Sequence, residues 1–380
     1  MKAILLQGMA FGDESKGATV DALCRKFPVD QIVRYNGGPQ TAHNVVTPQG
    51  VHHTFSQFGS GMLANSTVKT HLSRFMLINP FSMMREAAAL PTYTPVWNRV
   101  TIDRQCVVIT PMHKRLNQLR EKARREGAHG SCGVGVGVAR ELSLRYGDRV
   151  LLVEDFADEN RIHMKLLFMF SQLGFEIDRL QRELKIPDMD FDFEHMARAY
   201  KDFGSYAKVV DKLEPSDLML FEGAQGVLLD ERKEFLPHNT WTNCTFGNAD
   251  NLLSEVGCSD RLRIGCFRSY FTRHGHGPFP TEDVDLTKSF KEAHNGTGEF
   301  QGAFRCGKFD FDLAKKALDI VGGLDYLSIS HLDRASLEVG DEISSTLGVP
   351  VGVWATGPTS NHRGFNCELI DRLDKVLETC

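Results

Sequence analysis

The sequence GMAFGDESKGATVD at residues 8–21 follows a short apolar run at residues 2–7 and leads into a segment with helical spacing. A strand, a glycine-rich turn and a helix start, in that order, place backbone N–H groups and the positive end of a helix dipole around an anion. The stretch therefore predicts a phosphate-binding loop. Its unusual member is Asp13, because a carboxylate and a phosphate are both negatively charged. A carboxylate in such a loop normally binds a metal ion or takes part in a proton transfer.

This loop alone does not decide the function. GDESKG lacks the G-x-x-x-x-G-K-[ST] spacing of the Walker loop, and glycine-rich turns after a first strand are common. The alternative interpretation is a solvent-exposed turn that caps a helix over residues 17–27. The other loops of the chain have to separate the two interpretations.

Length and composition favour one large α/β unit. The chain has 380 residues, of which 42% are hydrophobic, so we expect a single domain over residues 1–380 with a substantial core. The formal net charge of −5 argues against sequence-independent binding to nucleic acid or to an anionic membrane. Local phosphate sites remain allowed.

The cysteines indicate a reducing compartment. The nine cysteines form an odd set without a C-x-x-C pair, which argues against a disulfide framework. No stretch approaches 18 uninterrupted apolar residues, and the segment before the first glycine-rich turn is too short for a signal sequence. We therefore expect a soluble, cytoplasmic protein.

Short apolar runs recur beside the glycine-rich loops and are separated by longer segments with helical spacing. This pattern predicts an α/β fold with a mainly parallel central sheet flanked by helices. The predicted strands are residues 32–35, 107–109, 151–153, 218–221, 264–267, 326–329 and 351–353.

The clearest predicted helix covers residues 111–126, with Thr110 as its cap, Pro111 at its first position and Gly127 to end it. Its late basic residues are more typical of a solvated helix face than of a nucleic-acid stripe. Further helices are predicted over about 155–184 and 191–212. Together these two form a helical excursion from the sheet over about 155–212.

Three further loops carry polar groups suited to chemistry. The loop RYNGGPQTAHN at 34–44 places His43 just beyond a predicted strand and a glycine pair, where an imidazole can polarise a substrate atom. A lone histidine is more often structural. The sequences FEGAQG at 221–226 and YFTRHGHGPFPT at 270–281 add two more glycine-rich loops, which favours a functional role for His43.

These loops, with S-x-LD at 330–333 and ATGP at 355–358, resemble the adenylosuccinate synthetase family in motif and order across nearly the whole chain. Any one of these motifs could match by chance, but the whole set in this order is specific for the family. The resemblance implies a two-step reaction. A nucleoside triphosphate phosphorylates O6 of a 6-oxopurine nucleotide, and the amino group of L-aspartate then displaces that phosphate.

The resemblance also implies roles for individual residues. Asp13 matches the base that removes the N1 proton, and it is implied to bind Mg²⁺ together with the backbone carbonyl of Ala42. His43 matches the histidine that stabilises charge on O6. The residues implied to bind the triphosphate nucleotide are Gly12, Ser15, Lys16, Gly17, His331, Asp333 and Gly357.

The other two substrates have their own implied contacts. The residues implied to bind the purine nucleoside monophosphate are Gln40, Ser131, Cys132, Arg145, Gln225 and Thr240. Cys132 stands where the family has a hydroxyl, so Ser131 is the stronger candidate of the two. Arg145 matches an arginine that reaches the site from a neighbouring subunit, which implies a homodimer. L-Aspartate is implied to meet Thr297, Gln301 and Arg305.

Three departures from the family pattern bear on the substrates. The segment at 330–333 carries His331 where the family has a lysine that packs on guanine, which favours ATP or dATP over GTP. The aspartate loop retains one arginine, Arg305, and has Ala303 and Phe304 near the position of a ribose-binding arginine. The chain is also compact for this family. An apolar wall favours 2′-deoxyribose, because a buried hydroxyl without a partner costs about 1–3 kcal/mol.

These departures resemble the phage and archaeal branch that makes 2-amino-2′-deoxyadenylosuccinate from dGMP, a step toward diaminopurine-containing DNA. If a phage encodes the chain, the expected location is the host cytoplasm. Retention of Asp13 keeps the alternative of a true adenylosuccinate synthetase that uses IMP and GTP. A third alternative, from another class, is a GTPase-like nucleotide-binding regulator, which has no use for His43 or Arg305. Ser15, where the family has glycine, is either a harmless substitution or an extra hydroxyl for the triphosphate.

Overall fold

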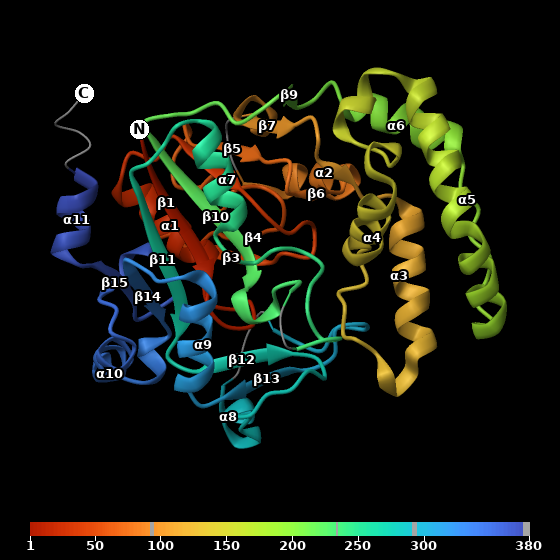
Figure 1. The fold of residues 1–380 in the computed structure, drawn as a ribbon. Helices are drawn as coiled ribbons and strands as arrows, with labels where there is room; N and C mark the ends of the chain where they lie inside the picture. The colour runs from red at the N-terminus through yellow and green to blue at the C-terminus, as the bar shows by residue number, and fades with distance from the viewer. Residues whose placement is uncertain (92–94, 233–234, 291–294, 375–380) are drawn as a thin grey trace.

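The computed structural model of the chain describes residues 1–91, 95–232, 235–290 and 295–374. At its centre the described residues form a ten-stranded sheet in the order β16-β15-β14-β11-β1-β10-β2-β5-β7-β9 (Figure 1). Neighbouring strands run parallel throughout, apart from the antiparallel pair β15 and β16. The predicted α/β fold with a mainly parallel sheet is confirmed.

The strands of this sheet are β1 (Lys2–Gly8), β2 (Gln31–Arg34), β5 (Lys69–Leu72), β7 (Val100–Asp103), β9 (Lys208–Val210), β10 (Leu218–Gly226), β11 (Arg261–Arg268), β14 (Tyr326–Ser330), β15 (Val351–Ala355) and β16 (Arg363–Phe365). Three two-stranded sheets accompany it: β3 (His43–Val46) with β4 (His52–Phe55), β6 (Leu77–Ile78) with β8 (Val107–Val108), and β12 (Phe271–His274) with β13 (Phe304–Gly307).

The helices are α1 (Lys16–Lys26), α2 (Pro80–Ala89), α3 (Pro111–Arg124), α4 (Val136–Tyr146), α5 (Glu159–Leu184), α6 (Phe193–Phe203), α7 (Gly247–Glu255), α8 (Val284–Ser289), α9 (Phe311–Val321), α10 (Leu337–Leu347) and α11 (Cys367–Asp374).

Both faces of the central sheet are buried, as its nearly continuous apolar strands require. On β1, Ala3 and Leu5 point to the face covered by α7, α9 and α10, and Ile4 and Leu6 point to the face covered by α1 and α11. All four side chains are fully buried. Because successive strand residues face opposite sides, one short apolar run supplies both cores.

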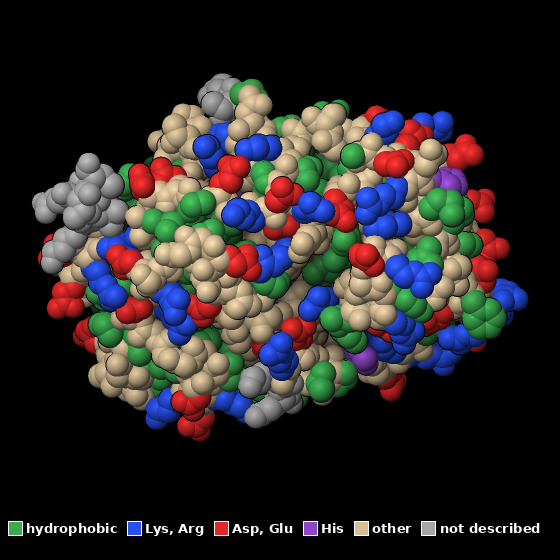
Figure 2. All heavy atoms as spheres, turned by 45° about the horizontal axis from the view of Figure 1, so that its top comes forward, with side chains coloured by type: hydrophobic (Ala, Val, Ile, Leu, Met, Phe, Trp, Pro, Cys, Tyr) green, Lys and Arg blue, Asp and Glu red, His purple; other side chains and the backbone are tan. Residues whose placement is uncertain are grey.

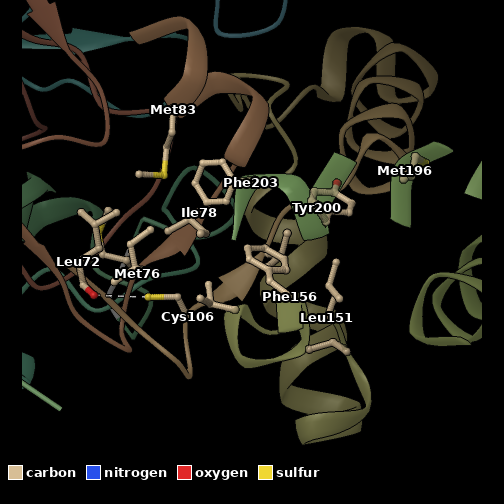
Figure 3. Packing of buried hydrophobic residues seen from close by; sticks show 14 of the residues in the cluster. Leu72, Met76, Ile78, Met83, Cys106, Leu151, Phe156, Met196, Tyr200 and Phe203 are labelled. Atoms are coloured by element: carbon tan, nitrogen blue, oxygen red, sulfur yellow. Dashed lines mark hydrogen bonds between the residues drawn. The ribbon is translucent and has the colours of Figure 1, made fainter. Parts of the chain in front are cut away.

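A third core lies beyond one end of the sheet, where α3, α4, α5 and α6 pack together (Figure 1). Figure 3 shows its centre, where Phe156 stacks on Tyr200 with ring centroids 5.8 Å apart and Phe203 meets Phe156 edge-on. The helical excursion thus builds its own hydrophobic cluster and continues it into β5 and β7.

Six of the seven predicted strands are confirmed, although one of them lies outside the central sheet, and the strand predicted at 151–153 is wrong. The segment predicted at 107–109 gives β8, which pairs with β6 outside the central sheet. The segment predicted at 151–153 forms a single bridge between Leu152 and Val107 and then enters a short 3-10 turn at Val153–Ala157. These apolar runs are buried in the helical cluster instead, because apolar character marks burial and not strand pairing.

The predicted helix at 191–212 is wrong beyond residue 203. Helix α6 ends at Phe203, and after Gly204 the chain enters β9, which pairs with β7 at the edge of the central sheet. The predicted helix at 155–184 begins later, at Glu159, because Asp158 caps it by accepting hydrogen bonds from two backbone N–H groups. Strands β5, β7 and β9 were not predicted, since they are short and carry polar residues.

Three basic residues in the second half of α3, Arg120, Lys122 and Arg124, pair with acidic ones. Arg120 binds Glu141 and Glu176 at 2.7 and 2.8 Å, and Lys122 binds Glu299 at 3.1 Å. Figure 2 shows lysine and arginine side chains interspersed with aspartate and glutamate over the face that it presents. Within the described ranges, no helix is long and apolar enough to cross a membrane.

The aromatic stack of the helical cluster predicts a large stability effect. Phe156 is 3% exposed, so Phe156→Ala is expected to lower the free energy of unfolding by about 3–5 kcal/mol. Phe175→Ala is the matched control, because Phe175 is 77% exposed, and its effect is expected within about 0.5 kcal/mol of zero. Urea denaturation followed by circular dichroism measures both; equal effects would contradict the packing described here.

Candidate active site

The candidate site lies where parallel strands end at one edge of the central sheet. Asp13 follows β1, Gln40 follows β2, Gln225 ends β10, Arg268 ends β11 and His331 follows β14. These five strands are neighbours, in the order β14-β11-β1-β10-β2. The carboxyl ends of adjacent parallel strands meet at one edge, so loops distant in sequence converge there.

The first loop is organised around the buried ammonium group of Lys16. Its Nζ donates a hydrogen bond to the Gly12 carbonyl at 2.7 Å and pairs with Glu14 at 3.2 Å. The Gly12 N–H in turn donates to Glu14 at 2.7 Å. A Cβ on Gly8 would lie 2.2 Å from the Glu14 carboxylate, so glycine is required where β1 ends.

Helix α1 begins directly after this loop, and its first turn faces the site. Ser15 caps it in the left-handed backbone region, with φ 56°. That conformation disfavours residues other than glycine. Gly17 allows close packing against His43, because a Cβ would lie 2.6 Å from the His43 Cβ.

Asp13 is held through both its side chain and its backbone. His274 Nε2 donates to Asp13 Oδ2 at 3.0 Å, and Arg268 Nε donates to the Asp13 carbonyl. Burial raises the pKa of Asp13, but the hydrogen bond from His274 and the neighbouring positive charges outweigh it and bring this pKa to about 2. Asp13 is therefore ionised at neutral pH and can accept a proton.

His43 forms a buried pair with Glu222. Its Nδ1 lies 2.6 Å from Glu222 Oε1, and Ser60 donates to the same carboxylate through its backbone N–H at 2.9 Å and through its hydroxyl. Burial lowers the pKa of His43 to about 4, although Glu222 raises it. Burial raises the pKa of Glu222, but the charge of Arg34 and the His43 contact lower it to about 2. The imidazole is thus uncharged at neutral pH and donates to a carboxylate.

The larger of two cavities at this edge has a volume of about 640 Å³ and contains Asp13 and His43 in its wall. The predicted substrate residues that line it are Gln40, Ala42, Ser131, Cys132, Gln225, Thr240, Thr297 and Gln301. The two Gln40 amide atoms and Gln225 Oε1 are buried without hydrogen-bond partners among the described residues. Because unpaired buried polar atoms are costly, these amides indicate a polar ligand here.

The loop at 130–133 is held by Asn117 of α3. Asn117 donates to the Ser131 hydroxyl at 2.9 Å and accepts from the Gly135 N–H at 3.0 Å. Burial, with the charge of Asp13, raises the pKa of Cys132 to about 11, so Cys132 remains a thiol. Ser131 is therefore the stronger hydrogen-bonding group of the two toward a phosphate.

Two predicted residues lie outside the walls of both cavities. Arg145 is exposed near the end of α4, so its predicted role in a neighbouring subunit stays a prediction. Arg305 on β13 pairs with Glu282 at 2.6 Å and donates to the Gly277 carbonyl at 2.6 Å. Thr297 and Gln301 line the larger cavity, so the structure does not place all three predicted aspartate ligands together.

The smaller cavity, about 340 Å³ in volume, contains every residue predicted to bind the triphosphate nucleotide: Gly12, Ser15, Lys16, Gly17, His331, Asp333 and Gly357. Arg268, Arg334 and Arg363 also line it. A helix start and several cations around one cavity are suited to a polyanion.

His331 lies in this smaller cavity without a charge. Its Nδ1 is 3.0 Å from the Ser330 hydroxyl, and its ring meets Tyr270 edge-on with centroids 5.5 Å apart. Burial and the charges of Arg268 and Arg334 lower the pKa of His331 well below its ordinary value. At neutral pH this position therefore carries no cation to place over a base.

A family model described as adenylosuccinate synthetase matches residues 5–361. The chain belongs to this family. It is 32% identical over 343 residues to the adenylosuccinate synthetase of Nitrosococcus oceani, covering 87% of this chain and 77% of that protein. The enzyme from Ectopseudomonas mendocina is 30% identical over 345 residues, covering 87% and 78%. The chain is accordingly a carbon–nitrogen ligase of the adenylosuccinate synthetase type.

Two solved structures share the fold. Fully ligated adenylosuccinate synthetase from Plasmodium falciparum superposes with a TM-score of 0.78 at 17% identity, over 96% of this chain and all of that chain. Succinoaminodeoxyadenylate synthetase (PurZ) of cyanophage S-2L, bound to dGMP and dATP, has a TM-score of 0.69 at 17% identity, over 99% of each chain. At these identities the likeness establishes the fold alone.

The carboxylate and carbonyl predicted to bind Mg²⁺ are close to both cavities. Asp13 and Ala42 line the larger and the smaller cavity alike. Among the described residues no group of three or more acidic, histidine or cysteine side chains forms a metal cage. Mg²⁺ typically binds through one or two carboxylates plus substrate phosphates, so this donor set fits it.

Four residues of this adenylosuccinate synthetase-type site were missed by sequence reasoning: Glu222, Arg268, His274 and Arg363. Glu222 and His274 lie inside the glycine-rich motifs FEGAQG and TRHGHGPFPT, so the sequence indicated that their loops belong to the site. It did not indicate which side chains they contact. Arg268 and Arg363 come from strand ends that carry no motif. Only the folded chain brings these four side chains to the same edge.

Arg363 predicts a defined defect in nucleotide binding. Its Nη1 donates to the Thr359 carbonyl at 2.9 Å, and its Nε is buried without a partner among the described residues. Because the guanidinium lines the smaller cavity, Arg363→Met is expected to raise the KM for the triphosphate about 10- to 100-fold. The KM for the purine monophosphate is expected to stay unchanged.

Arg372→Met is the matched control for this variant, since Arg372 lies on α11 and pairs with Asp325 away from both cavities. Initial rates measured against each substrate separate the two KM values. An Arg363 variant with an unchanged triphosphate KM would remove this residue from the donor site.

Proposed function

We propose that this chain joins L-aspartate to C6 of dGMP, with hydrolysis of ATP or dATP, and gives 2-amino-2′-deoxyadenylosuccinate. The observation that carries the proposal is the shared wall of the two cavities. Asp13 and His43 line both of them. A proton acceptor and an imidazole between two nucleotide-sized cavities suit phosphoryl transfer from one nucleotide to another.

Phe304 supports dGMP over a ribonucleotide. It pairs with His274 across β12 and β13, and the two ring centroids are 5.1 Å apart. His274 lines the larger cavity and Phe304 lies beside it, outside the residues that line either cavity, and the Phe304 ring has no group that could hydrogen-bond a ribose 2′-hydroxyl. A PurZ structure with the same fold is bound to dGMP, which agrees with this choice.

His331 supports ATP or dATP over GTP. The lysine that packs on guanine elsewhere in the family is replaced here by an imidazole that is uncharged at neutral pH. Asp333 lines the same cavity and is retained. The cation that favours guanine is absent from position 331, and the PurZ neighbour is bound to dATP.

In the first step, Asp13 accepts the N1 proton of the purine, and O6 attacks the γ-phosphorus of the donor. The nucleoside diphosphate leaves, and a 6-phosphoryl nucleotide remains. Glu222 accepts the Nδ1 proton of His43 and so orients the ring, and its carboxylate balances the positive charge that the imidazole carries when Nε2 is also protonated and donates to O6. In the second step, the amine of L-aspartate attacks C6 and loses a proton, and inorganic phosphate leaves.

L-Aspartate is proposed to bind Thr297, Gln301 and Arg305. Arg305 now pairs with Glu282, so binding requires the substrate carboxylate to take the place of Glu282 at the guanidinium. Arg305 lies on β13, and Thr297 and Gln301 lie in the segment that precedes it. Movement of that segment would bring the three residues onto one substrate.

Two further parts of the proposal concern Mg²⁺ and the subunits. The Asp13 carboxylate and the Ala42 carbonyl would hold Mg²⁺, which neutralises phosphate charge when it is bound. We also propose a homodimer in which Arg145 of one subunit completes the monophosphate site of the other. Its exposure near the end of α4 leaves its guanidinium available to a second copy.

Phosphate release with a matrix of nucleotides tests the proposal. dGMP, GMP, dIMP and IMP are each combined with ATP, dATP and GTP, with and without L-aspartate. The expected result is aspartate-dependent release with dGMP and either adenine triphosphate. Turnover of IMP with GTP and none with dGMP identifies adenylosuccinate synthetase instead. Hydrolysis that needs neither aspartate nor a 6-oxopurine identifies a GTPase-like regulator.

Asp13→Ala is expected to lower kcat at least about 100-fold, because the proton acceptor and a metal ligand are both lost. Binding of dGMP, measured by calorimetry without the donor, is expected to persist. Asp285→Ala is the control, since the Asp285 side chain is 98% exposed, and it is expected to be fully active. An active or an unfolded Asp13 variant would count against this role.

A further inference from the structure

We propose that His274 is a positioning residue for Asp13, which its imidazole N–H holds in the orientation needed to accept the purine N1 proton. The inference rests on the proposed function, because it takes Asp13 as the base. His274 Nε2 lies 3.0 Å from Asp13 Oδ2. One carboxylate oxygen is thus engaged, and the other is left for the substrate.

The imidazole is itself held by the β12–β13 pair. His274 is the last residue of β12 and pairs in register with Phe304 of β13. The His274 ring packs against the Phe304 ring in a tilted arrangement, with an interplanar angle of 57°. The His274 side chain is 19% exposed. A side chain packed on one face by an aromatic ring presents its N–H in a fixed direction.

The polar contact to Asp13 is the notable feature of this histidine. His274 Nδ1 is buried and has no hydrogen-bond partner among the described residues. An apolar side chain would fill the same space without leaving a buried nitrogen unpaired. The contact that a histidine adds over such a side chain is therefore the hydrogen bond to Asp13.

Asp13 needs external support because of its local backbone. The preceding Gly12 has φ +116°, and residue 15 has left-handed φ, so the loop lacks a repeating hydrogen-bonded structure at this point. Arg268, at the end of β11, donates to the Asp13 carbonyl, and His274 donates to its carboxylate. Backbone and side chain are thus fixed from one neighbouring segment, residues 268–274.

His274 also lies on the side of the site that is proposed to bind the purine monophosphate. It lines the larger cavity but not the smaller one, whereas Asp13 lines both. A displacement of about 1 Å at a reacting group costs up to about 100-fold in rate. Loss of this hydrogen bond is therefore expected to act on the chemical step more than on substrate binding.

The test compares His274→Val, which removes the donor, with His274→Gln, whose side-chain amide can place an N–H near the position of Nε2. We expect His274→Val to lower kcat about 10- to 100-fold, with the KM for dGMP changed by less than about threefold. His274→Gln is expected to recover most of kcat. His276→Val is the matched control, because His276 is exposed two residues further along.

The outcomes separate this inference from the proposed function. If the wild-type chain shows no aspartate-dependent turnover of dGMP, the proposed function fails. If the wild type is active and His274→Val keeps or gains kcat, the inference alone fails, because the hydrogen bond from His274 to Asp13 then makes no contribution to turnover. Equal losses in His274→Val and His274→Gln also overturn it, since they indicate a packing role.

A folding defect is detected by thermal unfolding and by calorimetric binding of dGMP to each variant. If His274→Val does not fold, His274→Asn replaces it, because that amide is too short to reach Asp13 from the same backbone position. Loss of kcat in His274→Asn with dGMP binding intact supports the inference, and full activity overturns it.

Discussion

Parallel pairing of β1 with β10 and β11 is the constraint on which the site depends. In that register Gly8 lies opposite Gly226 on one side and Cys266 on the other, so three loops leave the sheet at the same level. The loop after β1 supplies Asp13, the end of β10 supplies Gln225, and the end of β11 supplies Arg268. Because alternate residues of β1 pack into two different cores, a one-residue shift in this register would exchange the side chains between the cores as well as separate the loops.

Paired charges then set the chemistry of this edge. Lys16 is balanced by Glu14, and Arg34 and Glu222 share a buried environment with His43. His274 and the nearby cations keep the half-buried Asp13 ionised, whereas burial keeps the imidazole of His43 uncharged although Glu222 opposes it. Asp13 and His43 both line the two cavities, so a carboxylate and an imidazole with different protonation behaviour face the same space, which suits phosphoryl and carbon–nitrogen chemistry in one place.

Much of the architecture was readable from local pattern. Apolar runs at the positions of β2, β10, β11, β14 and β15 predicted the central sheet, since buried parallel strands are apolar on both faces. The run at 107–109 forms strand β8 outside the central sheet, and the run at 151–153 forms no strand, because burial against a helical cluster produces the same apolar signal as a central strand. Strand β9 was hidden in a predicted helix, because an edge strand of three residues carries no pattern of its own.

The sequence by itself determined the family and the order of the loops, and it singled out Asp13 and His43 as candidate catalytic residues. It could do so because each motif is a short continuous stretch at the end of a strand. Only the tertiary structure decided their partners. Glu222 lies 179 residues from His43 in the chain, and His274, which contacts Asp13, belongs to the separate two-stranded sheet of β12 and β13. The grouping of Lys16 with Arg268 and Arg363 around one cavity is likewise a product of strand order, which no local spacing encodes. Contacts of this kind form when distant strands pair, so they become visible only in the folded chain.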